Sequence, residues 1–134
     1  MNMQFWMVAV GLWGCGSQSE NKSGSPVQES HTDGGLYHVY VENDPHPPVT
    51  GATHLALDIS TPDESLGVEG ASLTITPWMP DHGHGISEAP VITEQGEGSY
   101  GASFAFSMPG DWDVSIVIDG ESGTDEVVFG YEVE

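Results

Sequence analysis

The sequence almost lacks basic residues. Its 134 residues include one lysine, Lys22, and no arginine, against 21 acidic residues, so the formal net charge is −20 with neutral histidines. Proteins bind nucleic acid by displacing counterions with lysine and arginine, and anionic membrane surfaces attract basic segments. The composition therefore excludes nucleic acid as a partner and makes anionic membrane surfaces poor partners for the folded part. Because so large a charge repels itself in the compact state, we expect working conditions rich in salt or divalent cations.

Cysteine and long apolar runs are also scarce. Cys15 is the single cysteine, which excludes an internal disulfide and any zinc or iron–sulfur site built from a cysteine cluster. Residues 5–13 form the longest run that is almost wholly apolar. A membrane-spanning helix needs about 20 apolar residues, so this run is too short to cross a bilayer. Its length and position are typical of the apolar region of a secretory signal.

The run ends in Leu12-Trp13-Gly14-Cys15, and the pattern Leu12-x-Gly14-Cys15 resembles a bacterial lipobox. In such a motif the cysteine is acylated and becomes the new N-terminus. We therefore expect a lipoprotein signal peptide at 1–14 and a lipid anchor on Cys15, with the membrane contacted through that lipid only. The alternative is a buried structural cysteine in an N-terminal helix. Signal peptides usually begin with positive charge; none precedes this run, which leaves open a natural start upstream of Met1.

Residues 16–35 are rich in Ser, Gly, Gln, Glu, Asn and Thr and contain almost no large apolar side chain. Such a segment buries too little surface to offset its chain entropy. We therefore interpret 15–35 as the lipidated cysteine and a flexible linker, in which His31 is solvated, and 36–134 as the folded domain.

No helical period is sustained in the domain. Short β-branched and aromatic runs alternate instead with turn residues, which is typical of an all-β sandwich or barrel. The clearest run is 98–108, where every second residue is apolar or aromatic from Tyr100 to Met108. We predict an immunoglobulin-like β-sandwich of about seven strands, namely 36–42, 52–59, 71–76, 98–108, 112–119, 127–133 and a weaker edge strand at 86–93, which Pro90 interrupts.

The residues Pro77-Trp78-Met79-Pro80-Asp81-His82-Gly83-His84-Gly85 are the densest group of potential ligands in the chain. Prolines and glycines favour a shaped loop here. Imidazole suits copper, zinc, iron and nickel, whereas a thioether is soft and selects Cu(I). We therefore predict a copper site formed by Met79, His82 and His84. Asp81 is expected to orient an imidazole or to ligate a harder ion. The alternative is that Met79 caps the core edge, Asp81 makes a turn hydrogen bond and both histidines are solvated.

Other groups are weaker candidates. His54 lies on the face opposite the apolar residues of its run, His38 and His46 flank the first predicted strand, and Met108 is more often a core residue than a ligand, so we expect none of the four to bind a metal. Acidic residues in two turns offer a calcium site as an alternative, but they lack the spaced ladder of a defined calcium loop, and a solvated acidic face is the better interpretation. These residues are Asp111, Asp113, Asp119, Glu121, Asp125 and Glu126. No nucleophile elbow, metalloprotease helix or phosphate-binding loop is present, so we expect no catalytic activity.

Four segments in this order, 70–75, 78–85, 98–100 and 108–114, resemble the FixH/YtkA-like domain over roughly residues 45–120. The resemblance implies a small immunoglobulin-like sandwich in an exported or membrane-anchored bacterial protein, linked with copper handling and oxidase assembly and without an established catalytic activity. The family loop often reads Met-Pro-x-Met-Gly-His. Met79 and His84 match its first methionine and its histidine, while His82 stands at the second methionine, a change that shifts preference from Cu(I) toward Cu(II) or a mixed site.

Together these features predict a lipid-anchored protein of the cell envelope, on the periplasmic face or at the outer membrane. It would bind copper through its central loop and would serve as a metal-binding accessory to an envelope partner or metal-delivery target. Two alternatives stay open. One is an interaction module that uses no metal, and the other is a structural or adhesion domain stabilised by calcium.

Overall fold

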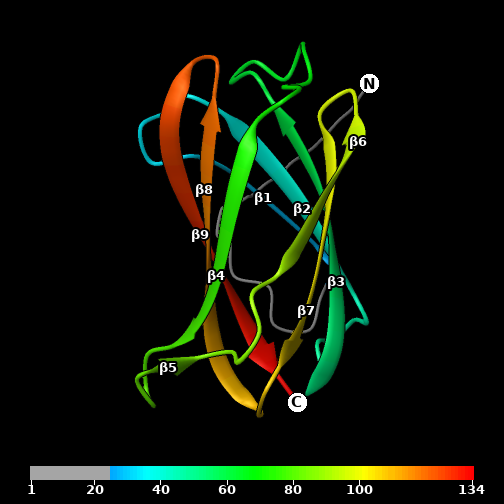
Figure 1. Cartoon of the computed structure of the whole chain (residues 1–134), viewed down its shortest axis with the longest axis vertical. Helices are drawn as coiled ribbons and strands as arrows, with labels where there is room; N and C mark the ends of the chain where they lie inside the picture. Colours follow the sequence, from blue (N-terminus) through cyan, green and yellow to red (C-terminus); the bar gives the residue numbers. More distant parts are fainter. Residues whose placement is uncertain (1–24) are drawn as a thin grey trace, which may run out of the picture.

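The computed structural model describes residues 25–134, so the expected signal peptide and Cys15 lie outside the described residues. These residues form two antiparallel sheets packed face to face (Figure 1), and the predicted all-β sandwich is confirmed. One sheet has the strand order β1-β2-β3-β7-β6 and the other β5-β4-β8-β9. The strands are β1 (Val27–His31), β2 (His38–Asp44), β3 (Gly51–Ser60), β4 (Ser72–Met79), β5 (His84–Gly85), β6 (Val91–Gly96), β7 (Ser99–Phe106), β8 (Gly110–Gly120) and β9 (Gly123–Val133).

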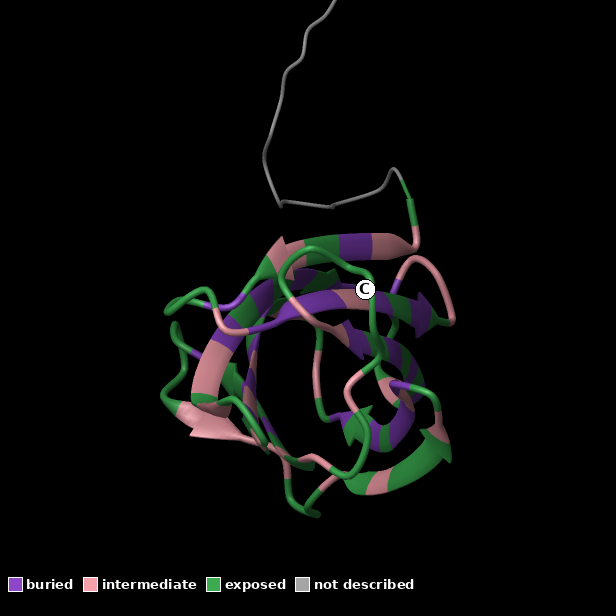
Figure 2. Cartoon of the chain, turned by 90° about the horizontal axis from the view of Figure 1, so that it is seen from above, coloured by how far each residue is buried: buried purple, intermediate pink, exposed green. Residues whose placement is uncertain are grey.

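The core follows from the period-two pattern of the long strands. Side chains alternate between the two faces of a strand, and burial alternates in the same way along β3, β8 and β9. Figure 2 shows such alternating buried and exposed bands along several strands. In β8, for example, Trp112, Val114, Ile116 and Ile118 are all at most 1% exposed. The predicted core residues of these strands are therefore confirmed. None of the described residues belongs to a helix that could cross a membrane.

Residues 25–134 form nine strands, whereas the sequence predicted about seven. The first addition is β1, which lies within the expected linker and pairs with β2 along its whole length. Its residues, Val-Gln-Glu-Ser-His, are mostly polar. An edge strand can be held by main-chain hydrogen bonds to its neighbour, so its side chains need to bury little apolar surface. Gln28 is the exception: its side chain is buried and its Nε2 donates to Gly130 O of β9 at 3.0 Å. The domain therefore begins by residue 27, and the boundary at residue 36 was placed too late.

The second addition is β5, two residues long, inside the segment expected to be a loop. The predicted edge strand at 86–93 is also shifted, because β6 begins only at Val91, directly after Pro90. Proline has no N–H to give to a ladder, so pairing starts after it. β6 does lie at the edge of its sheet, as predicted.

Candidate functional site

The segment 77–85 forms a small hairpin at one end of the sandwich, beside the β7–β8 turn (Figure 1). Pro77 does not interrupt the ladder as expected, because it lies inside β4 opposite Val114 of β8. The turn closes after Met79, whose carbonyl oxygen accepts hydrogen bonds from the N–H of His82 at 3.2 Å and of Gly83 at 2.8 Å. Gly83 has φ = 68°, a conformation that favours glycine. Asp81 lies in this turn and is exposed.

The hairpin places Met79 directly opposite His84. Side chains of directly opposed antiparallel residues lie on the same face, with Cβ atoms about 4.5–5.5 Å apart. Met79 is 1% exposed and His84 is half-buried. The His84 ring meets Trp112 edge-on, with centroids 6.0 Å apart, so both side chains face the end of the core. A thioether and an imidazole therefore converge where the core meets solvent.

Hydrogen bonding orients the His84 ring. Its Nδ1 lies 3.0 Å from the carbonyl oxygen of Gly85. Since a carbonyl oxygen can only accept, Nδ1 carries the proton and Nε2 of a neutral ring keeps its lone pair. Metal-binding histidines are usually oriented in this way, with the second ring nitrogen donating to a carbonyl or carboxylate.

His82 completes the predicted group from the turn. It is exposed, and its ring centroid lies 5.8 Å from that of His84. With metal–nitrogen bonds of about 2.0–2.1 Å, two imidazoles on one ion have centroids about 5–6 Å apart. The structure therefore brings all three predicted residues to one hairpin, with Met79 inside, His84 at the boundary and His82 outside.

The other candidates lie elsewhere. His46 and His54 line a pocket with Glu42 and Asp44, and the Nδ1 of His54 lies 3.2 Å from Ser103 Oγ. Met108 is partly buried against the core. Its carbonyl oxygen accepts a hydrogen bond from Trp112 Nε1 at 3.0 Å, so it helps to fix the ring that His84 contacts.

Three of the six acidic residues considered for calcium, Asp119, Asp125 and Glu126, accept hydrogen bonds within the domain. Asp125 accepts hydrogen bonds from the hydroxyl of Thr32 at 2.7 Å and from the N–H groups of Gly34 and Leu36. These bonds, that from Thr32 first, lower its pKa from 3.8 to about 2. Asp119 accepts from Thr124, and Glu126 from Ser115. Among residues 25–134, these acids do not form a group of three that could hold an ion.

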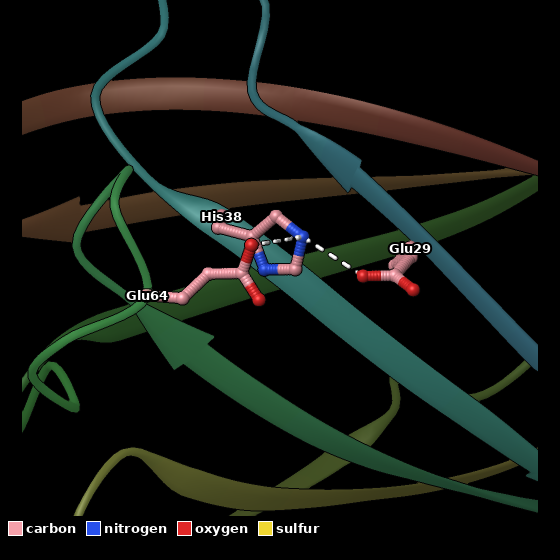
Figure 3. Close-up of side chains that lie close together, drawn as sticks. All are labelled: Glu29, His38 and Glu64. Atoms are coloured by element: carbon pink, nitrogen blue, oxygen red, sulfur yellow. Dashed lines mark ion pairs between the residues drawn. The ribbon is translucent and has the colours of Figure 1, made fainter. Parts of the chain in front are cut away.

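Sequence reasoning missed a different group, formed by Glu29, His38 and Glu64 (Figure 3). One ligand atom from each residue lies within 4.8 Å of the other two. His31, expected to be solvated, is exposed but stacks edge-on against His38 with centroids 5.0 Å apart. The residues come from a presumed linker, a strand and a distant turn, so no local motif could have revealed them.

The domain as a whole is similar to known proteins in sequence pattern and in fold. The model of the YtkA-like family matches residues 37–117, more than half of the chain. No curated protein matches its sequence. Among solved structures, the chain is similar to a DUF4426 family protein from Pseudomonas aeruginosa PAO1, with a TM-score of 0.56 and 11% identity over 80% of this chain and 94% of that one. At that identity the likeness concerns the fold alone.

Proposed function

The chain belongs to the YtkA-like family, as its motifs predicted, and on this premise we propose that it is an accessory protein of the bacterial cell envelope that binds copper through Met79, His82 and His84. In this proposal the protein has no catalytic activity. It is held at the membrane by a lipid on Cys15, and it holds copper for an envelope partner or delivery target.

The observation that carries the proposal is the opposed pair of Met79 and His84 at the end of the core. A thioether and an imidazole form a soft to borderline ligand set, which favours copper over zinc or calcium. The burial of Met79 favours Cu(I), because a weakly hydrated ion loses little on entering an apolar site. His82 adds a second nitrogen ligand from the exposed side of the hairpin. Two imidazole nitrogens also suit Cu(II), so the same site could bind either oxidation state of copper.

The surroundings of the pair support a defined site. Trp112 is 1% exposed and forms one wall, and its Nε1 is engaged by the Met108 carbonyl. The proton on His84 Nδ1 is directed at Gly85 O, so Nε2 is available to an ion without a change of tautomer.

The proposal is tested by measuring the Cu(I) affinity of the full chain under reducing conditions, in competition with a chromophoric chelator. His84→Ala should weaken binding at least about tenfold, since it removes a direct ligand. His54→Ala is the matched control, because His54 lies on the outer face of β3, away from the hairpin. Equal affinities for the wild type, His84→Ala and His54→Ala would reject the copper site and would favour the interaction module.

A further inference from the structure

We infer that Glu29, His38 and Glu64 form a second metal site, distinct from the hairpin site, which binds Zn(II). The three side chains come from β1, from the first residue of β2 and from the turn after β3 (Figure 3). The start of β2 and the turn after β3 lie at the end of the sandwich opposite the β4–β5 hairpin (Figure 1).

The burial of His38 is the first observation. In β2 the core-facing residues are Val39, Val41 and Asn43, so His38 belongs to the outer face, where Glu42 is exposed. Yet the side chain of His38 is only 8% exposed. Segments on either side of β2 therefore cover this imidazole on the outer face of the sheet.

β1 provides one side of the cover. His31 is paired directly with His38, and Glu29 lies two residues before it. Residues two apart point to the same face of a strand, so Glu29 is the diagonal neighbour of His38. The carboxylate Oε1 of Glu29 lies 3.1 Å from the Nε2 of His38.

The turn after β3 provides the other side, and internal hydrogen bonds fix its shape. The Asp63 carboxylate accepts from the hydroxyl of Thr61 at 2.7 Å and from the N–H and hydroxyl of Ser65 at 3.1 and 2.8 Å. The N–H of Glu64 donates to Thr61 O at 2.8 Å. This turn brings the Oε2 of Glu64 to 3.8 Å from the same Nε2 of His38.

A single proton on Nε2 of His38 accounts for a hydrogen bond to one of the two carboxylates. The single N–H at Nε2 can serve Glu29, but 3.8 Å is too long for a hydrogen bond to Glu64. Residues 25–134 contain no lysine or arginine to balance the second carboxylate. A divalent cation would balance both charges and would accept a lone pair from each of the three ligands.

The donor set and spacing identify the ion. Zinc binds nitrogen and carboxylate oxygen at about 2.0–2.2 Å, which places neighbouring ligand atoms about 3–4 Å apart. The distances of 3.1 and 3.8 Å lie in this range. The group has no sulfur for Cu(I), and calcium requires six to eight oxygens. Bound zinc would join β1 and the 61–66 turn to β2, so it would also stabilise the N-terminal edge of the domain.

The test is a calorimetric titration with Zn(II) at high salt, which suppresses uptake by the acidic surface. It uses the full chain carrying His82→Ala and His84→Ala, so that the result does not depend on the hairpin site. We expect one equivalent to bind, and Glu64→Gln or Glu29→Gln to weaken binding at least about tenfold. Both substitutions are isosteric and affect exposed side chains, so we expect the fold to be preserved.

Glu97→Gln is the matched control for Glu64→Gln. Both residues are exposed glutamates with positive φ, 59° for Glu97 and 64° for Glu64, but Glu97 lies outside the group. A zinc-dependent shift of the His38 Nε2 resonance would identify the imidazole as a ligand. The proposal is overturned if Zn(II) fails to bind, if Glu64→Gln binds as tightly as Glu97→Gln, or if the His38 resonance does not move.

Discussion

At the scale of single residues, the hairpin site depends on a close approach between Met79 and Gly110. A Cβ added to Gly110 would lie 2.6 Å from the terminal methyl carbon of Met79, and Gly110 has φ = 134°. The absence of a side chain at this position therefore leaves room for the terminal methyl group of Met79.

We predict that Gly110→Ala lowers the free energy of unfolding by about 1–3 kcal/mol, because it adds backbone strain and displaces Met79. It should also weaken Cu(I) binding. Gly130→Ala is the control, since nothing lies within 4 Å of a Cβ at that position and its φ is ordinary. Urea denaturation measures both variants. Equal stability of the two variants would contradict the predicted packing.

A second residue, Asp125, connects stability to pH. Folding lowers its pKa from 3.8 to about 2, through hydrogen bonds from the Thr32 hydroxyl first and then from backbone N–H groups. A carboxyl with a lowered pKa contributes stability above its unfolded pKa and loses it as the pH falls through the folded value. The contribution is therefore complete at neutral pH and disappears between about pH 4 and pH 2.

We therefore expect Asp125→Asn to be less stable than the wild type at pH 7 and equally stable near pH 2. Comparing unfolding free energies of the two proteins across this range removes the general effect of titrating the other acids. A difference that stays constant with pH would show that the charge of Asp125 does not stabilise the loop.

At the scale of elements, the alternation of apolar and polar residues predicts a strand well where one face of that strand is buried. β3, β7, β8 and β9 were predicted on this basis and are confirmed. β1 was missed because main-chain pairing with β2, rather than an apolar face, holds it in place. β5 was missed because a strand of two residues is too short to show an alternating pattern. The ligands proposed within 79–84 stand close together in the sequence, whereas Glu29, His38 and Glu64 meet only after β1, β2 and the 61–66 turn are folded together.

One tyrosine links the irregular segment before β4 to the opposite sheet. The hydroxyl of Tyr100 in β7 donates to Val68 O at 2.7 Å and accepts from the N–H of Ala71 at 3.1 Å. Burial is the largest cause of its raised pKa. These bonds fix the chain between the 61–66 turn and β4.

We predict that Tyr100→Phe lowers the free energy of unfolding by about 1–3 kcal/mol, because two backbone groups lose their partner. Tyr40→Phe, on the outer face of β2, should change it by less than about 0.5 kcal/mol. Thermal unfolding measures both. A Tyr100→Phe protein as stable as Tyr40→Phe would show that the hydroxyl contributes nothing.

At the scale of the whole molecule, the net charge of −20 opposes folding through self-repulsion. Salt screens this repulsion, since the Debye length falls from about 10 Å at 0.1 M to about 3 Å at 1 M. We therefore expect Tm to rise by at least about 4 °C over this range of NaCl, roughly 1 kcal/mol. Calorimetric scans test this, and a Tm that is independent of salt would contradict it.

The central claim is that a methionine and histidines of one hairpin bind copper together. X-ray absorption at the copper edge of the Cu(I)-loaded full chain tests this most directly, with Met79→Leu as the matched variant of similar volume. The account predicts a sulfur neighbour at about 2.3 Å and nitrogen neighbours at about 2.0 Å in the wild type, with the sulfur lost in the variant. A wild-type spectrum with nitrogen and oxygen neighbours alone, or a sulfur neighbour retained in Met79→Leu, would contradict it.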